Sequence, residues 1–336
     1  MKFGPVDVDA AQDTILGAVL AHSLKLESGR LRKGVILTSD HLEQIRRAGI
    51  GQVTVARLDP DDIHENDAAV RLANALVPDP EAAGLRLSAA FTGRVNILAE
   101  GPGVVVLDVA ALERFNAIHP MITIATVPPF QQMAAGGMVA TIKIIAYAVP
   151  GADVVRAADA ARASVRLAGA LIGTVGLVVT NIPGGPSNAK GIRAISNRVR
   201  ALGMALAETC EVAHEEGPLA AAIQQIKGEM VLILTGSATS DPNDVAPSAL
   251  RRAGGQVERF GMPVDPGNLL FLGQLASRPV IGLPGCARSP ALNGADWVLA
   301  RVACGIEVTS ADIAGMGVGG LLKEIPTRPQ PRNTSS

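Results

Sequence analysis

Aromatic residues are scarce in this sequence: Phe, Tyr and Trp together make up 2% of its 336 residues. Modules that bind single-stranded nucleic acids stack the bases on exposed aromatic rings, so this composition argues against that class. The core must instead be filled by Ala, Val, Ile and Leu, which suits helices packed on a parallel sheet. A net charge of −1 adds no general attraction to nucleic acid or to an anionic membrane. Neither partner is predicted, and an anionic ligand must be held by a local group of donors.

Cysteine and histidine are rare and scattered. The three cysteines, Cys210, Cys286 and Cys304, are far apart and form no CxxC pair, which argues against a disulfide framework and against a zinc site. The five histidines, His214 among them, match no catalytic-triad motif. An acidic cluster at 59–67 is interpreted as the first turn of a helix, with a metal site as the less favoured alternative, because no EF-hand pattern is present. We therefore predict no metal ligands.

Long apolar runs are absent as well. No run approaches the ~20 residues that a membrane span requires. The first residues, MKFGPVDVDAAQD, lack the apolar core of a signal peptide. These two absences predict a soluble, cytoplasmic protein.

The composition and the order of patterns predict two domains. Hydrophobic residues make up 48% and charged residues 18% of the chain, which suits folded cores of ordinary size. We predict a mixed α+β region over 1–150, opening with a helix at 9–23, and a connecting helix over 151–170. From 171 to 310 strands and helices alternate, which is typical of an α/β fold with a doubly wound parallel sheet in three layers. The Pro-rich, polar residues 325–336 predict a flexible tail.

The predicted sheet is organised around residues 230–247. The apolar run 231–234 has the length of a buried parallel strand, and small polar residues follow it directly, up to a helix cap at Asp244. Strands within 174–180 and 279–283 also run into loops of small residues. Ligands of open α/β sheets bind beyond the carboxyl ends of the strands, so the three loops are predicted to converge on one site.

The candidate binding residues all lie in these three loops, 181–191, 235–244 and 282–290. They share small size, which lets a ligand approach backbone N–H groups, or a polar side chain that can contact a phosphate. Cys286 is either a sulfur contact to the ligand or a small residue that fills a tight turn. The candidates are Gly184, Gly185, Ser187 and Asn188; Thr235, Gly236, Ser237, Ala238 and Thr239; and Pro284, Gly285, Cys286 and Ser289.

Two of the loops resemble motifs of a known family. TGSATSDPNDVAPSAL (235–250) is similar to TGGTGxxxxDVTPxA of the molybdopterin-binding domains of molybdenum-cofactor biosynthesis, and GLPGCARSP (282–290) is similar to their GLPGNP loop. VDPGN (264–268) resembles the PGKP element of the molybdenum-insertion enzymes. The likeness is strongest over about 171–305, and it is closest to bacterial molybdopterin-binding proteins that are often fused to a nucleotidyltransferase.

The resemblance implies a ligand and roles for two aspartates. The ligand would be molybdopterin or the molybdenum cofactor, with its phosphate in the loops. Asp244 matches the motif aspartate that takes part in adenylyl transfer or metal insertion, and Asp241 lies close by, so both are candidate catalytic residues and candidate contacts for Mg²⁺. The family further implies a homo-oligomer and, as partners, a nucleotidyltransferase or a molybdoenzyme maturation factor.

The departures from the family favour binding over catalysis. The family's TGDE is replaced by Thr180, Asn181, Ile182 and Pro183, and Asn268 replaces the lysine of PGKP. The acidic pair that helps to place magnesium is therefore missing. Three functions stay open: a carrier of molybdopterin or its finished cofactor, an enzyme of molybdenum insertion or nucleotidyl transfer, and a related dinucleotide pyrophosphatase.

Overall fold

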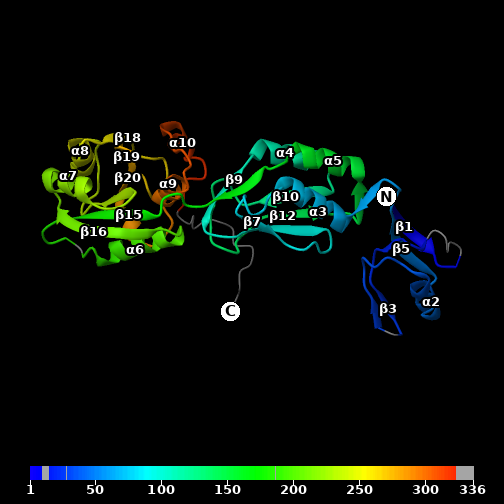
Figure 1. Ribbon diagram of the computed structural model, residues 1–336. Helices are drawn as coiled ribbons and strands as arrows, with labels where there is room; N and C mark the ends of the chain where they lie inside the picture. Colours follow the sequence, from blue (N-terminus) through cyan, green and yellow to red (C-terminus); the bar gives the residue numbers. More distant parts are fainter. Residues whose placement is uncertain (10–14, 28, 186, 323–336) are drawn as a thin grey trace. The chain divides into compact units, whose positions relative to one another are not determined.

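The computed structural model describes residues 1–9, 15–27, 29–185 and 187–322 (Figure 1). The chain forms two compact units, one of Met1–Gly101 with Val105–Leu167 and one of Pro102–Val104 with the chain from Ala168 onward. Residues 151–167 thus belong to the first unit, whereas the sequence placed the boundary at 150. None of the helices in the described ranges is both long enough and apolar enough to span a membrane. The predicted tail, 325–336, lies outside the described residues.

The first unit opens with a small antiparallel sheet in the order β1–β5–β2. Its strands are β1 (Lys2–Asp7), β5 (Gln52–Arg57) and β2 (Val19–Leu20). The predicted helix at 9–23 is wrong over 16–23, because Val19 and Leu20 pair with β5. Gly17 has a φ of 79°, a left-handed conformation that a right-handed helix does not contain. Residues 10–14 lie outside the described part. A hairpin and one helix complete this region: β3 (Leu24–Leu26), β4 (Gly29–Leu31) and α2 (Ser39–Arg47).

The rest of the first unit contains a four-stranded antiparallel sheet in the order β10–β12–β8–β7. Its strands are β7 (Leu85–Leu87), β8 (Arg94–Ala99), β10 (Ile122–Thr126) and β12 (Met138–Ile144). The helices of this part of the unit are α3 (Glu65–Leu76), α4 (Val109–Ile118) and α5 (Gly151–Ala160). The shared core includes Leu72, Ile97, Phe115 and Ile142, all fully buried. The shorter strands are β6 (Asp62–His64), β9 (Gly103–Leu107), β11 (Gln132–Met133), β13 (Ala148–Pro150) and β14 (Val165–Ala168).

Two predictions for the first unit need correction. The acidic cluster at 59–67 does not form a single first turn, because 62–64 is strand β6 and the helix begins at Glu65. The described residues hold no group of three or more His, Cys, Asp or Glu side chains able to bind a metal ion. The connecting helix predicted at 151–170 is helical only to Ala160, since Ala163 has a φ of 55° and 165–168 is strand β14.

The second unit contains a six-stranded sheet in the order β16–β15–β17–β20–β19–β18. The four strands β15 (Thr174–Asn181), β16 (Ala205–Ala213), β17 (Met230–Leu234) and β20 (Arg278–Leu283) are parallel. β18 (Gln256–Phe260) and β19 (Phe271–Leu275) are antiparallel. The predicted all-parallel sheet is therefore wrong at this edge. Only two residues, Ala276 and Ser277, join β19 to β20, and a parallel crossover needs about a dozen.

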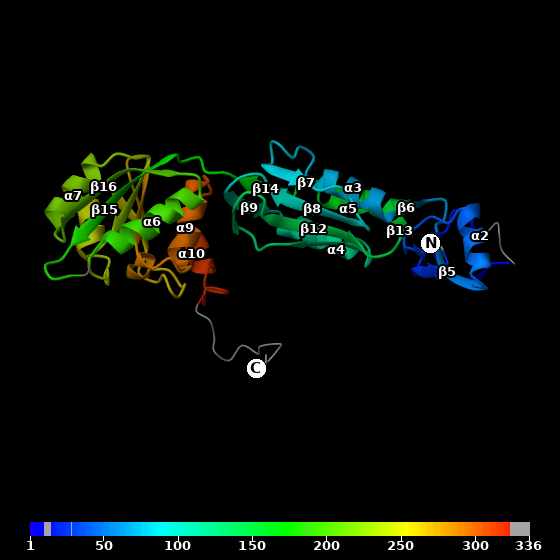
Figure 2. The ribbon, with the colours of Figure 1, turned by 90° about the horizontal axis from the view of Figure 1, so that it is seen from below.

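Helices cover both faces of this sheet. On one face α7 (Glu216–Gln225) and α8 (Val245–Arg252) pack on Val178, Val231 and Ile233, which are fully buried. Figure 1 shows α6 (Ala189–Ala201) on the opposite face, and Figure 2 shows it in front of the strands. An ion pair joins α6 to α9 (Gly294–Ala303), and the short helix α10 (Ser310–Gly315) follows. The carboxyl ends of the four parallel strands lie together at one end of the sheet.

Candidate functional site

Three loops begin side by side at the carboxyl ends of β15, β17 and β20. The last paired residues of the central strands are in line, because Val179 of β15 pairs with Leu234 of β17, and Leu234 pairs with Leu283 of β20. β17 and β20 end at Leu234 and Leu283, whereas β15 continues to Asn181, paired with β16. β15, β17 and β20 are thus consecutive in the sheet, as convergence of the three loops requires, and the first and third loops each start one strand away from the second.

Arg288 joins the three loops. It lies at the end of the short 3₁₀ helix η1 (Gly285–Arg288) in the third loop and is half-buried. Its Nη2 donates to the carbonyl oxygen of Thr235 at 2.8 Å, and its Nη1 donates to Oδ1 of Asn188 at 2.9 Å. A Cβ on Gly191 would lie 3.2 Å from Nη1, so a glycine in the first turn of α6 leaves room for the guanidinium. Sequence reasoning missed Arg288, although it stands inside the GLPGCARSP segment.

The charge of Arg288 is not neutralised by the described part of the chain. Both oxygens that it contacts are neutral, and among the described residues it forms no ion pair with a carboxylate. Burial lowers the pKa of its guanidinium. Asn188, itself buried, donates from Nδ2 to Asn181 Oδ1 and, at 3.0 Å, to Glu211 Oε2. The nearest acid in this network therefore meets Asn188 and not the guanidinium.

The second loop is held by its own threonines. Thr235 Oγ1 donates to the carbonyl oxygen of Ser237 at 2.6 Å and lies 3.4 Å from Thr239 Oγ1, and both threonines are buried. Their hydroxyls thus shape the loop and do not face solvent. Ser237 and Ala238 are exposed. The backbone N–H groups of 237–239 donate no hydrogen bond to the described residues, which leaves three successive donors for a ligand.

A buried hydroxyl connects this loop to a histidine. Thr180 is fully buried, and its Oγ1 accepts the N–H of Gly236 at 2.8 Å and lies 2.9 Å from His214 Nδ1. A Cβ on Gly236 would lie 2.8 Å from the carbonyl oxygen of Thr180, so only glycine fits there without a shift. Sequence reasoning interpreted His214 as one of several scattered histidines, because its partner Thr180 is 34 residues away.

The two candidate catalytic aspartates organise the start of α8. Asp244 is its N-cap, and both carboxylate oxygens accept backbone N–H groups, Oδ2 from Ser240 at 2.9 Å and Oδ1 from Val245 at 2.7 Å. Asp241 is exposed and its Oδ1 accepts the N–H of Asn243 at 2.8 Å. The observed role of Asp244 is therefore the helix cap that its position predicts.

The remaining candidates differ in accessibility. In the first loop Gly184, Gly185 and Ser187 are exposed, and Ser187 Oγ accepts the N–H of Ala189 at 3.3 Å. In the third loop Pro284 is buried, whereas Gly285 and Ser289 are exposed.

Cys286 is half-buried, and burial raises the pKa of its thiol. A thiol of raised pKa stays neutral near pH 7, which favours the turn-filling interpretation over a thiolate.

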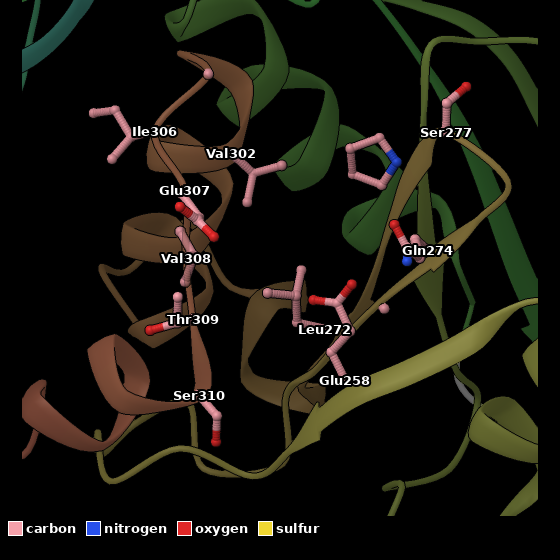
Figure 3. A pocket seen from close by; sticks show the side chains of 13 residues that line it. Glu258, Leu272, Gln274, Ser277, Val302, Ile306, Glu307, Val308, Thr309 and Ser310 are labelled. Carbon is pink, nitrogen blue, oxygen red and sulfur yellow. The ribbon is translucent and has the colours of Figure 1, made fainter.

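Two of the hollows lined by described residues lie in the second unit. One, of about 530 Å³, borders the loop edge and includes Asn181, His214 and Ser237 in its walls. The other, of about 630 Å³, is shown in Figure 3, with Glu258, Leu272 and Glu307 among its lining residues. Ser277 and Pro279 place this second hollow at the amino end of β20, opposite the three loops. It contains no residue that the sequence singled out.

Comparison with known proteins gives no family assignment. No family model and no curated protein matches the sequence. Among solved structures, a molybdopterin biosynthesis MoeA protein from Pyrococcus horikosii aligns with 14% identity over 90% of this chain and 75% of its own, with a TM-score of 0.32. A molybdenum cofactor biosynthesis protein from Pyrococcus furiosus aligns with 14% identity and a TM-score of 0.24, and the alignment covers 94% of this chain but 65% of that protein. TM-scores of this size carry no conclusion about fold or function.

Proposed function

We propose that the second unit binds the phosphate of an anionic ligand between its three loops, and that the ligand is molybdopterin or the molybdenum cofactor, bound for cofactor biosynthesis or delivery. The observation that carries the proposal is the half-buried cation of Arg288, which contacts two of the loops from the third and has no acidic partner in the described residues. The identity of the ligand rests on the similarity of 235–250 and 282–290 to molybdopterin-binding motifs.

The donors around Arg288 suit a phosphate. A guanidinium has five N–H groups, of which the two contacts to Asn188 and Thr235 use only part, and a phosphate accepts from such groups in pairs. The free N–H groups of 237–239 add neutral donors beside it. A half-buried cation without a counter-ion is partly desolvated, so a bound anion would stabilise the folded loops as well as hold the ligand.

Binding without catalysis is favoured over the enzymatic alternatives. Mg²⁺ is usually held by one or two carboxylates together with substrate phosphates. Here Asp244 already accepts two backbone N–H groups, and no larger cluster of metal-binding side chains occurs in the described ranges. These residues therefore fit a magnesium site poorly. The molybdenum-insertion or nucleotidyl-transfer enzyme and the dinucleotide pyrophosphatase stay as alternatives, supported by the DVAP motif at Asp244.

A carrier of this kind needs a protein that receives its ligand. We propose a nucleotidyltransferase or a molybdoenzyme maturation factor in that role, and a cytoplasmic homo-oligomer as the working form. Cross-linking and sedimentation of the purified protein test the oligomer directly.

The decisive measurement is the affinity for molybdopterin under anaerobic conditions, with inorganic phosphate as competitor. Arg288→Met should weaken binding by about 10- to 100-fold, because a charge-assisted hydrogen bond is lost. Arg288→Lys keeps the positive charge but lacks the paired N–H groups of the guanidinium, so its affinity should lie between those of the wild type and Arg288→Met. Arg200→Met is the matched control, since Arg200 is an exposed arginine of the same unit whose hydrogen bonds within the described residues go to Ser196 and Asn197.

The outcomes separate the three functions. Folded Arg288→Met that binds molybdopterin as tightly as the wild type would overturn the proposed site. Magnesium-dependent turnover of an adenylylated pterin, lost in Asp244→Ala, would establish the transferase alternative. Hydrolysis of a dinucleotide without any pterin would establish the pyrophosphatase.

A further inference from the structure

The hollow of about 530 Å³ at the loop edge is built by the ends of three neighbouring strands. Asn181 ends β15 and is followed by Ile182 and Pro183, and Ala213 ends β16 and is followed by His214 and Glu215. Ser237 lies three residues after the end of β17. Its volume is within the range of small-molecule sites. Asn181 connects it to the proposed phosphate site, because Asn181 accepts from Asn188 and Asn188 accepts from Arg288.

The His214 ring is fixed in this hollow by Thr180. The Thr180 hydroxyl accepts the N–H of Gly236 and lies 2.9 Å from Nδ1 of His214, to which it can donate its own hydrogen. A neutral imidazole whose Nδ1 accepts carries its proton on Nε2. Nε2 has no hydrogen-bond partner within the described residues. In this tautomer His214 offers one N–H donor, from Nε2, on a ring held by Thr180.

Glu215 and an apolar wall complete the lining. Glu215 is exposed, its side chain makes no capping hydrogen bond to α7, and it forms no ion pair with any described residue. Ile182 and Pro183 add apolar surface from the first loop. The lining thus combines a histidine held by Thr180, an exposed carboxylate without an ion-pair partner among the described residues, and an apolar wall.

We infer that this hollow selects the ring of the ligand, and that His214 and Glu215 read the edge of that ring. The inference rests on the proposed function, since the ring extends from the phosphate at Arg288. The matching chemistry is a flat heterocycle with a carbonyl beside an N–H and an amino group, as in pterins and guanine. His214 Nε2–H donates to the carbonyl, and the Glu215 carboxylate accepts from the N–H and the amino group. His214 and Glu215 are thereby specificity-determining residues that touch the ligand.

The test compares two phosphorylated ligands that differ at this edge. 6-Hydroxymethylpterin phosphate carries the amino group, and the corresponding lumazine phosphate has a carbonyl in its place. Calorimetry with the full-length protein should show the pterin bound about 10-fold more tightly, as expected for one charge-assisted hydrogen bond. Glu215→Gln should remove most of this preference.

Two variants of His214 distinguish a histidine that contacts the ligand from one that only supports the fold. His214→Gln places an amide N–H near the position of Nε2, and His214→Asn places an amide oxygen near the position of Nδ1. The Gln variant should keep most of the pterin affinity, whereas the Asn variant should lose about 10-fold although it keeps the Thr180 partner. A merely structural histidine would give the opposite order.

Failure of this inference is distinguishable from failure of the proposed function. Equal binding of pterin and lumazine, with unchanged affinity in the His214 variants, would overturn the ring assignment while phosphate competition and the Arg288→Met loss persist. Absence of phosphate competition and of any Arg288 effect would overturn the anion site. In that case the same two rings without phosphate still test the edge preference, and equal binding of both overturns it.

Discussion

Gly282 lies inside β20, directly opposite Phe271 of β19. A Cβ at this position would lie 1.9 Å from the Phe271 ring, whereas a Cβ on Gly285, three residues later, meets nothing within 4 Å. Gly282→Ala should therefore lower the free energy of unfolding by at least about 2 kcal/mol, because a buried ring must move, and Gly285→Ala should change it by less than about 1 kcal/mol. Urea unfolding followed by the fluorescence of Trp297, the single tryptophan, measures both. Equal stability of the two variants would contradict this packing.

A second prediction for a single residue is that Cys304 makes the stability of the fold depend on pH. Burial raises the pKa of its thiol from 9.0 to about 11. Above pH 9 the unfolded chain loses this proton while the folded chain keeps it, so stability is fully present below pH 9 and falls as the pH rises toward 11. The loss should be on the order of 2 kcal/mol. Cys304→Ala should show a smaller decrease over this range in the same unfolding assay, and identical slopes would contradict the burial.

At the scale of elements, Arg198 of α6 holds the third loop in place. Its Nε lies 2.6 Å from Asp296 of α9, and its other nitrogens donate to the carbonyl oxygens of Ala287, Ser289 and Ala291 at 2.8 to 2.9 Å. The Arg198 side chain is only 9% exposed. Arg198→Met should cost about 3 kcal/mol or more, because Asp296 is left buried without its cation. Ligand affinity should fall as well, since the loop that carries Arg288 loses its support.

The exposed ion pair between Arg252 and Glu216 is the matched control. These side chains are 62% and 46% exposed, so Arg252→Met should change stability by less than about 1 kcal/mol. Thermal unfolding of both variants beside the wild type measures the difference. An Arg198→Met variant as stable as Arg252→Met would show that the α6–α9 ion pair does not anchor the loop.

At the scale of the whole molecule, two separate cores predict separable effects. Phe115 is fully buried in the core of the first unit, and Ile233 is fully buried in that of the second. Phe115→Ala should destabilise the first unit by about 3 to 5 kcal/mol and leave molybdopterin affinity unchanged. Trp297 lies in the second unit, so its fluorescence should follow Ile233→Ala and not Phe115→Ala, while circular dichroism reports both. A shift of the Trp297 transition by Phe115→Ala would show that the units unfold together.

The local patterns of the second unit were largely predictable. The apolar run 231–234, the cap at Asp244 and the alternation of strands and helices depend on residues close in sequence, and β15, β17 and α8 lie where these patterns predict them. The helices predicted at 9–23 and 151–170 were wrong over part of their length, because apolar residues that suit a helix are also compatible with short strands. In these segments Gly17 and Ala163 adopt positive φ, and strand pairing decides the outcome.

The sequence by itself determined the three small-residue loops, the motif at 235–250 and the end of the sheet where they lie. Tertiary structure alone decided which polar groups meet there. Arg288 reaches Asn188 from 100 residues away, and Thr180 contacts Gly236 and His214 across two loops. The antiparallel edge of β18 and β19 likewise depends on a two-residue turn. Such contacts depend on strand order and register. These bring together side chains that are far apart in sequence, and the residues next to each of them in the sequence do not indicate its partner.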